Sequence, residues 1–137
     1  MVNDEIYEIY AIKYAHSERR TGDNFIGGDA HDGPMPLDYF IWAITNKKRT
    51  IILDTGFSLA TAKSRGREYL RNPGVGLGMI GIEPSQIKDV IISHMHYDHS
   101  GNEKLFPNAI YHLQDSEMAF CTGRNMCHEA INHPFSE

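Results

Sequence analysis

Residues 91–101 read IISHMHYDHSG, an apolar run that leads directly into a cluster of histidine and aspartate. On an extended segment that leaves a strand, residues two apart point the same way. His94 and His96 can therefore offer two imidazole nitrogens to a single cation. Asp98 and His99 follow at once, where a turn can aim them at a neighbouring point. The stretch is predicted to be a metal-binding loop at the end of a buried strand.

These side chains form two pairs of potential ligands, which suits two metal ions about 3.5–4 Å apart that share a hydroxide. Neutral imidazole suits zinc, iron or cobalt, and a carboxylate helps to balance the divalent charge. The alternative is a surface loop that is rich in histidine and binds nothing. The strand in front of the loop and Ser100-Gly101 behind it favour the metal site.

Composition limits what else the chain can be. It has 137 residues, 41% of them hydrophobic, and a net charge of −5, which fits one globular domain over residues 1–137. No basic patch offsets the acidic balance, so nucleic acid is not an expected partner. The N-terminal stretch MVNDEIYEIY has no apolar core of signal-peptide length, and no apolar run approaches a membrane span. Cys121 and Cys127 are predicted to be reduced thiols in a cytoplasmic protein.

The hydrophobic pattern places strands before helices. Residues 19–36 are dense in Gly, Asp and Pro and are predicted to form a long surface loop, whereas residues 72–84 are too rich in Gly to assign. Helices are expected at 58–70, opened by Ser58, and after Asp115. Strands are expected at residues 5–14, 37–45, 50–56, 89–93 and 108–113, the second and third of them joined as a hairpin by the polar turn NKKR.

The residues His94, His96, Asp98 and His99 match the H-x-H-x-D-H signature of the metallo-β-lactamase superfamily, which the chain resembles. The segment ILDTG at Ile52–Gly56 is similar to the strand-end aspartate motif of that superfamily. The resemblance implies two divalent metal ions, with zinc expected first and iron, cobalt or manganese as alternatives. It also implies that Asp54 orients the ligand loop through hydrogen bonds without touching metal. The alternative for Asp54 is an acid that only caps a turn.

Within the superfamily, the amino-acid sequence around the motif most resembles that of the N-acyl homoserine lactonases. The similar stretches are PMPLDYFIWAITNKKRTIILDTGF and GIEPSQIKDVIISHMHYDHSGNEKLFPNAIYHLQDSEM, with the N-terminal strand and its loop. The implied reaction is the opening of a lactone ring by a metal-bridging hydroxide, as in quorum quenching. Asp98 is then the catalytic group that passes a proton to the leaving alkoxide. The implied partner is a small lactone or ester, and a homo-oligomer is left open.

The implied fold is an α+β, αββα sandwich, of which this chain supplies about the first αβ half. In the family, two more histidines, a bridging aspartate and a tyrosine lie well downstream of the ligand loop. The chain is therefore interpreted as an apparently truncated N-terminal part of a single domain, inactive alone and with one sheet face exposed to water. The other histidines are predicted not to be ligands, and these are His16, His31, His112, His128 and His133.

Other functions remain open at this point. Hydrolases of the same fold act on thioesters, as in glyoxalase II-like enzymes, or on phosphodiesters. Iron-containing members are oxidoreductases, but they usually replace one histidine of the loop with an acid, and this loop keeps its histidines. The last alternative is an inactive, truncated metal-binding fragment.

Overall fold

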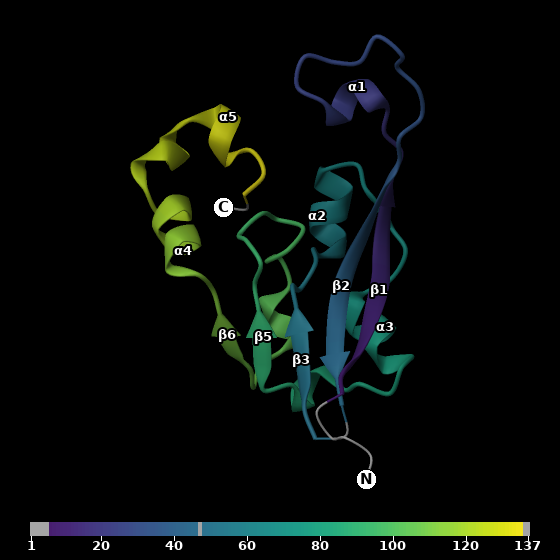
Figure 1. Cartoon of the computed structure of the whole chain (residues 1–137), viewed down its shortest axis with the longest axis vertical. Coiled ribbons are helices and arrows are strands. Elements are labelled where there is room, and N and C mark those ends of the chain that lie inside the picture. Colours follow the sequence, from purple (N-terminus) through teal and green to yellow (C-terminus); the bar gives the residue numbers. More distant parts are fainter. Residues whose placement is uncertain (1–5, 47, 136–137) are drawn as a thin grey trace.

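A six-stranded sheet runs through the computed structural model, which describes residues 6–46 and 48–135 (Figure 1). The strands lie in the order β4–β1–β2–β3–β5–β6. β3, β5 and β6 are parallel, and the other neighbours are antiparallel. The carboxyl ends of β3 and β5 therefore meet at one edge of the sheet, where loops carry sites in such sheets. The strands are β1 (Glu8–Ser17), β2 (Leu37–Thr45), β3 (Thr50–Leu53), β4 (Glu68–Tyr69), β5 (Asp89–Ile91) and β6 (Ile110–His112).

Short helices accompany the sheet, and the expected α+β class is confirmed. In the part of the chain that the structure describes, no helix is long and apolar enough to cross a membrane. The α-helices are α1 (Thr21–Asn24), α2 (Leu59–Ser64), α3 (Pro73–Gly78), α4 (Asp115–Cys121) and α5 (Glu129–Asn132). The 3₁₀ helices are η1 (Pro84–Gln86), η2 (Glu103–Leu105) and η3 (Arg124–Cys127).

Among the described residues, the core lies on one face of the sheet. α3 packs so closely on β1 that a Cβ on Gly76 would lie 2.4 Å from a methyl carbon of Ile12. The fully buried side chains include Tyr14 of β1, Ile41 of β2 and Val90 of β5, which alternate with residues of the other face. Phe57 and Leu77 fill the space above them. Burial of these side chains is the main stabilising term of the fold.

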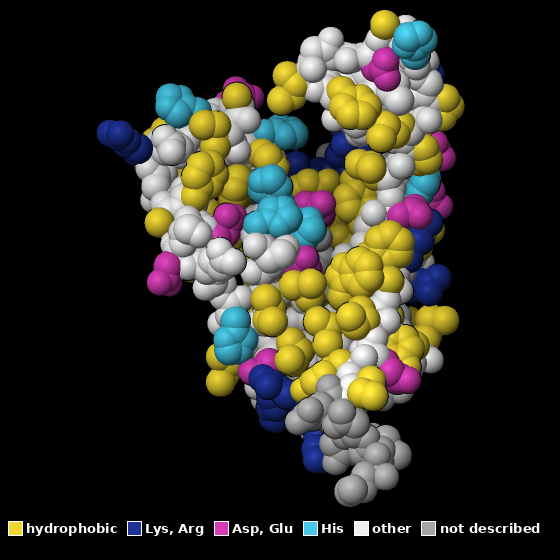
Figure 2. Space-filling model, in the orientation of Figure 1, with side chains coloured by type: hydrophobic (Ala, Val, Ile, Leu, Met, Phe, Trp, Pro, Cys, Tyr) yellow, Lys and Arg dark blue, Asp and Glu magenta, His cyan; other side chains and the backbone are white. Residues whose placement is uncertain are grey.

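The opposite face of the sheet carries an uncovered apolar surface (Figure 2). The strand register sets Ile44 of β2 beside both Ile9 and Ile51, and Trp42 beside Leu53. Ile9 is 66% exposed and Trp42 38% exposed, although both are large and apolar. The expectation that one sheet face would be open to water holds for the described residues.

Several predicted boundaries were wrong, each for a local reason. The first strand runs three residues later than expected, because its register continues through Ser17. The helix expected at 58–70 ends at Ser64, because Gly66 has φ +64° and the chain then turns into β4. Within 72–84, Asn72 caps α3 by accepting a hydrogen bond from Gly74 N, with Pro73 in the first turn. The strand predicted over 50–56 ends at Leu53.

Other expectations were confirmed. The loop at 19–36 contains only the one-turn helix α1, and the hairpin of β2 and β3 is present. The helix after Asp115 is α4. Three expected positions lie outside the described residues: Glu5 at the start of the first strand, Lys47 in the hairpin turn and the C-terminal Glu137.

Candidate metal centre

The histidine-rich loop packs against the end of β3, although the two are far apart in sequence. Thr55 N donates to the carbonyl oxygen of His99 (2.7 Å), and Gly101 N donates to that of Gly56 (2.9 Å). The approach leaves no room for side chains. A Cβ on Gly101 would lie 3.0 Å from the Gly56 oxygen, and a Cβ on Gly56, which has φ +70°, would lie 2.8 Å from the Tyr14 ring. The glycines allow the strand-end segment to support the loop directly.

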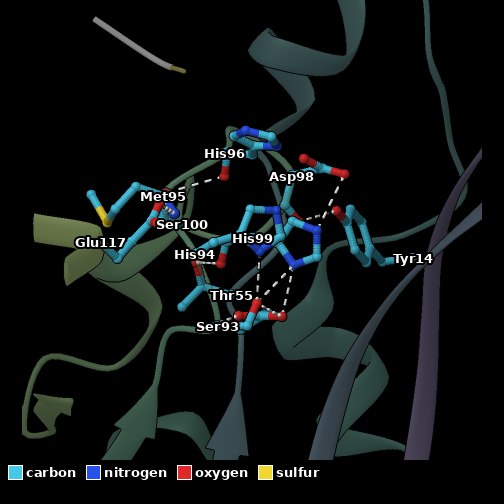
Figure 3. Close-up of polar contacts among 11 residues, drawn as sticks. Tyr14, Thr55, Ser93, His94, Met95, His96, Asp98, His99, Ser100 and Glu117 are labelled. Carbon is cyan, nitrogen blue, oxygen red and sulfur yellow. Dashed lines mark hydrogen bonds and ion pairs between the residues drawn. The ribbon is translucent and has the colours of Figure 1, made fainter. Parts of the chain in front are cut away.

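Three imidazoles of this loop lie together (Figure 3). The ring centroid of His94 is 3.9 Å from that of His99 and 4.6 Å from that of His96. Asp98 Oδ2 lies 3.5 Å from His99 Nε2. The structure thus brings together all four predicted ligands. Among residues 6–46 and 48–135, however, no three His, Cys, Asp or Glu side chains are placed so that they could hold a metal ion.

Asp54 lies beneath the imidazoles, only 3% exposed, and fixes two parts of the loop. Its Oδ1 accepts a hydrogen bond from Ser93 N (2.7 Å), and its Oδ2 accepts from Ser93 Oγ (2.9 Å). The same Oδ2 lies 2.7 Å from His99 Nδ1. Asp54 has φ +64°, a backbone conformation that is uncommon outside glycine. Asp54 therefore contacts both the residue before the ligand motif and its last histidine.

The electrostatic environment differs between the histidines. Burial lowers the pKa of His94, and the neighbouring His99 and His96 lower it further, so its neutral, metal-binding form is favoured. Burial also acts to lower the pKa of His99. The hydrogen bond to Asp54 and the charge of Asp98 outweigh burial, and the pKa of His99 is raised.

Aromatic side chains form the support below the loop. Tyr14 is fully buried and donates its hydroxyl hydrogen bond to the carbonyl oxygen of Asp98 (2.9 Å). Burial raises the pKa of Tyr14, so the phenol stays a neutral donor. The Phe57 ring packs on Tyr14 (4.9 Å between centroids) and on Tyr97 (5.5 Å). The backbone of Asp98 is therefore held by the core.

The donors fit a divalent metal in chemical type. Because Asp54 occupies Nδ1 of His99, the Nε2 of that ring, 3.5 Å from Asp98 Oδ2, is the nitrogen that could bind a metal. Ser93 Oγ lies 3.0 Å from Nδ1 of His94, which leaves the Nε2 of His94 in the same situation. Imidazole nitrogens with one carboxylate form a donor set suited to zinc, iron or cobalt.

The remaining histidines lie elsewhere or contribute only backbone. His112 is on β6, with Nε2 3.0 Å from Asp89 Oδ1, and His16 binds Asp38 (2.6 Å). The His31 side chain is 97% exposed. His128 precedes α5, and His133 offers its carbonyl oxygen to Arg65. None of these side chains joins the imidazole cluster.

The sequence analysis missed several groups that position the loop. Ser93 directly precedes the H-x-H-x-D-H motif and Thr55 lies within ILDTG, so these motifs were the available signal. Tyr14 and Arg65 carried no signal, because their contacts with the loop depend on strand register and helix placement. Glu117 of α4 accepts a hydrogen bond from Met95 N (2.9 Å), another contact between distant segments.

Comparison with known families places this site in context. A family model described as the metallo-beta-lactamase superfamily matches residues 34–113, which is more than half of the chain and includes the whole loop. The N-acyl homoserine lactonase AttM of Azorhizobium caulinodans is 29% identical over 106 residues, which cover 68% of this chain and 40% of that protein.

Solved structures agree in fold. A probable metal-dependent hydrolase from Staphylococcus aureus superposes with a TM-score of 0.67 at 18% identity, covering 87% of this chain and 51% of that one. AidC, a dizinc quorum-quenching lactonase bound to its product, gives a TM-score of 0.63 at 18% identity, covering 87% of this chain and 45% of AidC. The chain therefore spans about half the length of the proteins it matches.

Proposed function

Because this chain belongs to the metallo-β-lactamase superfamily, we propose that it is part of a metal-dependent hydrolase that opens the ring of N-acyl homoserine lactones. The superfamily match supports the metal-dependent hydrolase, and the similarity to AttM supports the lactone. The alternatives at the level of substrate are a thioester and a phosphodiester. We place residues 1–137 in the N-terminal part of one such domain, with further ligands outside these residues.

The proposed metal ligands are His94, His96, Asp98 and His99, and the proposed ions are two divalent cations, zinc first. When bound, such a pair supplies an acidified water and a polarised carbonyl. The geometry of the loop supports this assignment: Asp54 and Ser93 occupy the Nδ1 side of two rings. The observation that carries the proposal is the clustering of three imidazoles above a buried carboxylate.

The residues of this chain have separable tasks in the proposed reaction. Water adds to the lactone carbonyl carbon, the ring C–O bond breaks, and the product is a hydroxy acid. The Asp98 carboxylate takes up a proton from the attacking water and delivers it to the departing ring oxygen, which requires hydrogen-bond reach and a suitable pKa. Tyr14 holds the Asp98 backbone in place during this transfer, because its hydroxyl is bonded to the Asp98 carbonyl oxygen.

The test is an assay of substrate class. The full natural open reading frame that contains these residues would be expressed, its bound metal measured, and its turnover compared on a panel of acyl homoserine lactones, a glutathione thioester and a phosphodiester. We expect bound divalent metal and turnover of the lactones. Turnover of the thioester or the phosphodiester alone would overturn the lactonase proposal while leaving the metal-dependent hydrolase intact.

Asp54→Asn in the same full-length protein should keep the fold but cost about 10–100-fold in metal affinity or activity, the range typical of outer-shell partners. The amide keeps the size of the side chain but loses an acceptor, and either Ser93 or His99 then loses its bond. Zinc competition and kcat/KM measure the effect. Asp89→Asn is the control, because Asp89 pairs with Arg49 and His112, away from the imidazole cluster. Unchanged zinc affinity and unchanged kcat/KM in Asp54→Asn would show that Asp54 only caps a turn.

A further inference from the structure

Arg65 lies at the end of α2 and touches two separate segments near the site. Its Cζ is 3.9 Å from the centroid of the Tyr97 ring, so the guanidinium stacks on that ring. Its Nη2 donates to the carbonyl oxygens of His133 (2.9 Å) and Phe135 (3.2 Å). One side chain therefore joins the histidine-rich loop to the segment that follows α5.

Two of the partners of Arg65, Tyr97 and Phe135, are next to His96 in the chain or in contact with it. Tyr97 is the next residue in the chain, only 7% exposed, and its backbone N donates to the Pro134 carbonyl oxygen (2.8 Å). Phe135 forms a β-bridge with His96, and its ring meets the His96 imidazole edge-on at 4.9 Å and 86°. The His96 ring is thus held from the side of its own loop and from the side of Phe135.

The chemistry of these contacts requires arginine. A planar guanidinium can stack on an aromatic face while its N–H groups donate in the plane to two carbonyls, whereas a lysine ammonium is a compact charge without that geometry. Arg67 also contacts Tyr97, but its donors reach the Tyr97 hydroxyl (3.2 Å) and Ser17 Oγ (3.3 Å) rather than the 133–135 segment. Arg65 therefore adds a side-chain connection between the loop and the 133–135 segment to the backbone bond of Tyr97 and the bridge of His96.

We propose that Arg65 is a positioning residue for the metal site, which sets the direction of the His96 imidazole through Tyr97 and Phe135. This rests on the proposed function, in which His96 is a metal ligand. Because the preorganisation of a ligand is lost when its support is removed, the effect of losing Arg65 falls on metal binding more than on folding.

Arg65→Gln, Arg65→Lys and the control Lys63→Gln would be made in the full-length protein. Lys63 is exposed and belongs to the same helix, so its replacement removes a charge without touching the loop. Zinc affinity is measured by competition with a chromophoric chelator, the ligand field by the visible spectrum of the cobalt(II) form, and folding by melting of the metal-free protein.

We expect Arg65→Gln to bind zinc about 10–100-fold more weakly and to alter the cobalt spectrum, with metal-free melting close to wild type. Arg65→Lys should recover little, and Lys63→Gln should match wild type. Unchanged zinc affinity in Arg65→Gln, or an equal loss in Lys63→Gln, overturns the inference. If Arg65→Gln does not fold, Phe135→Leu tests the same path, and its unchanged cobalt spectrum is equally decisive. A wild-type protein without metal affinity removes the proposed function itself, and this inference with it.

Discussion

Replacing His96 with alanine in the full-length protein should strip metal from the site and lower turnover by more than the roughly 10–100-fold expected for outer-shell partners. Catalytic zinc usually keeps three protein ligands, so one lost imidazole leaves an incomplete shell that neither holds the ion nor acidifies its water. The loss should be in metal content first, because the support of the loop by Tyr14 and Asp54 does not involve the His96 side chain.

The measurements are metal content after dialysis and kcat/KM on the lactone panel. His112→Ala is the matched control, because it removes an imidazole from β6 that contacts Asp89 rather than the cluster. The control should keep both metal and activity. Normal metal stoichiometry and normal turnover in His96→Ala would contradict the assignment of His96 as a ligand.

The candidate site was predictable because it lies within one short stretch of sequence. The spacing of His94, His96 and His99 is local, and a strand that ends in a turn brings such residues together without help from distant segments. Asp54 was predicted through the resemblance of ILDTG to the strand-end aspartate motif of the superfamily, and the parallel pairing of β3 with β5 places its side chain at the same edge.

The supports of the site were not predictable in the same way. The bond from Tyr14 to Asp98 depends on a bulge in β1, where the register shifts between Lys13 and Ala15. Arg65 reaches its partners because α2 stops at Ser64 and the chain after α5 returns to the loop. No pattern within a window of a few residues carries such information.

The predicted end of the helix at 58–70 was wrong because a glycine interrupts the helical pattern. The apolar and polar pattern of residues 58–70 suits a longer helix, but Gly66 at φ +64° ends it. The chain then continues as β4, in which Glu68 lies opposite His16 in the strand register. The sheet order was likewise beyond the pattern, because β4 joins the edge next to β1 although it comes after β3 in the chain.

The open face of the sheet has a consequence for residues 1–137 when they are expressed alone. Its side chains pair across four strands: Ile9 with Ile44, Trp42 with Leu53, and Leu53 with Ile91. Contiguous apolar patches beyond a few hundred Å² are rare on soluble monomers. Burying this face in contact with another copy releases ordered water from every one of these side chains, which favours association.

We therefore expect polypeptide 1–137 to self-associate at micromolar concentrations, melt with low cooperativity and leave lactones intact. Trp42 is the only tryptophan of the chain and lies on this face, so its emission should shift to shorter wavelength as concentration rises.

Ile91→Lys places a charge on the face and should weaken association by about tenfold or more, since burying one isoleucine contributes about 1.5–3 kcal/mol. Val75→Lys is the control, because Val75 is 60% exposed on α3, which packs on the opposite face. A monomeric, cooperatively folded 1–137 whose Trp42 emission is independent of concentration, as checked by light scattering and fluorescence, would show that the exposed face is tolerated.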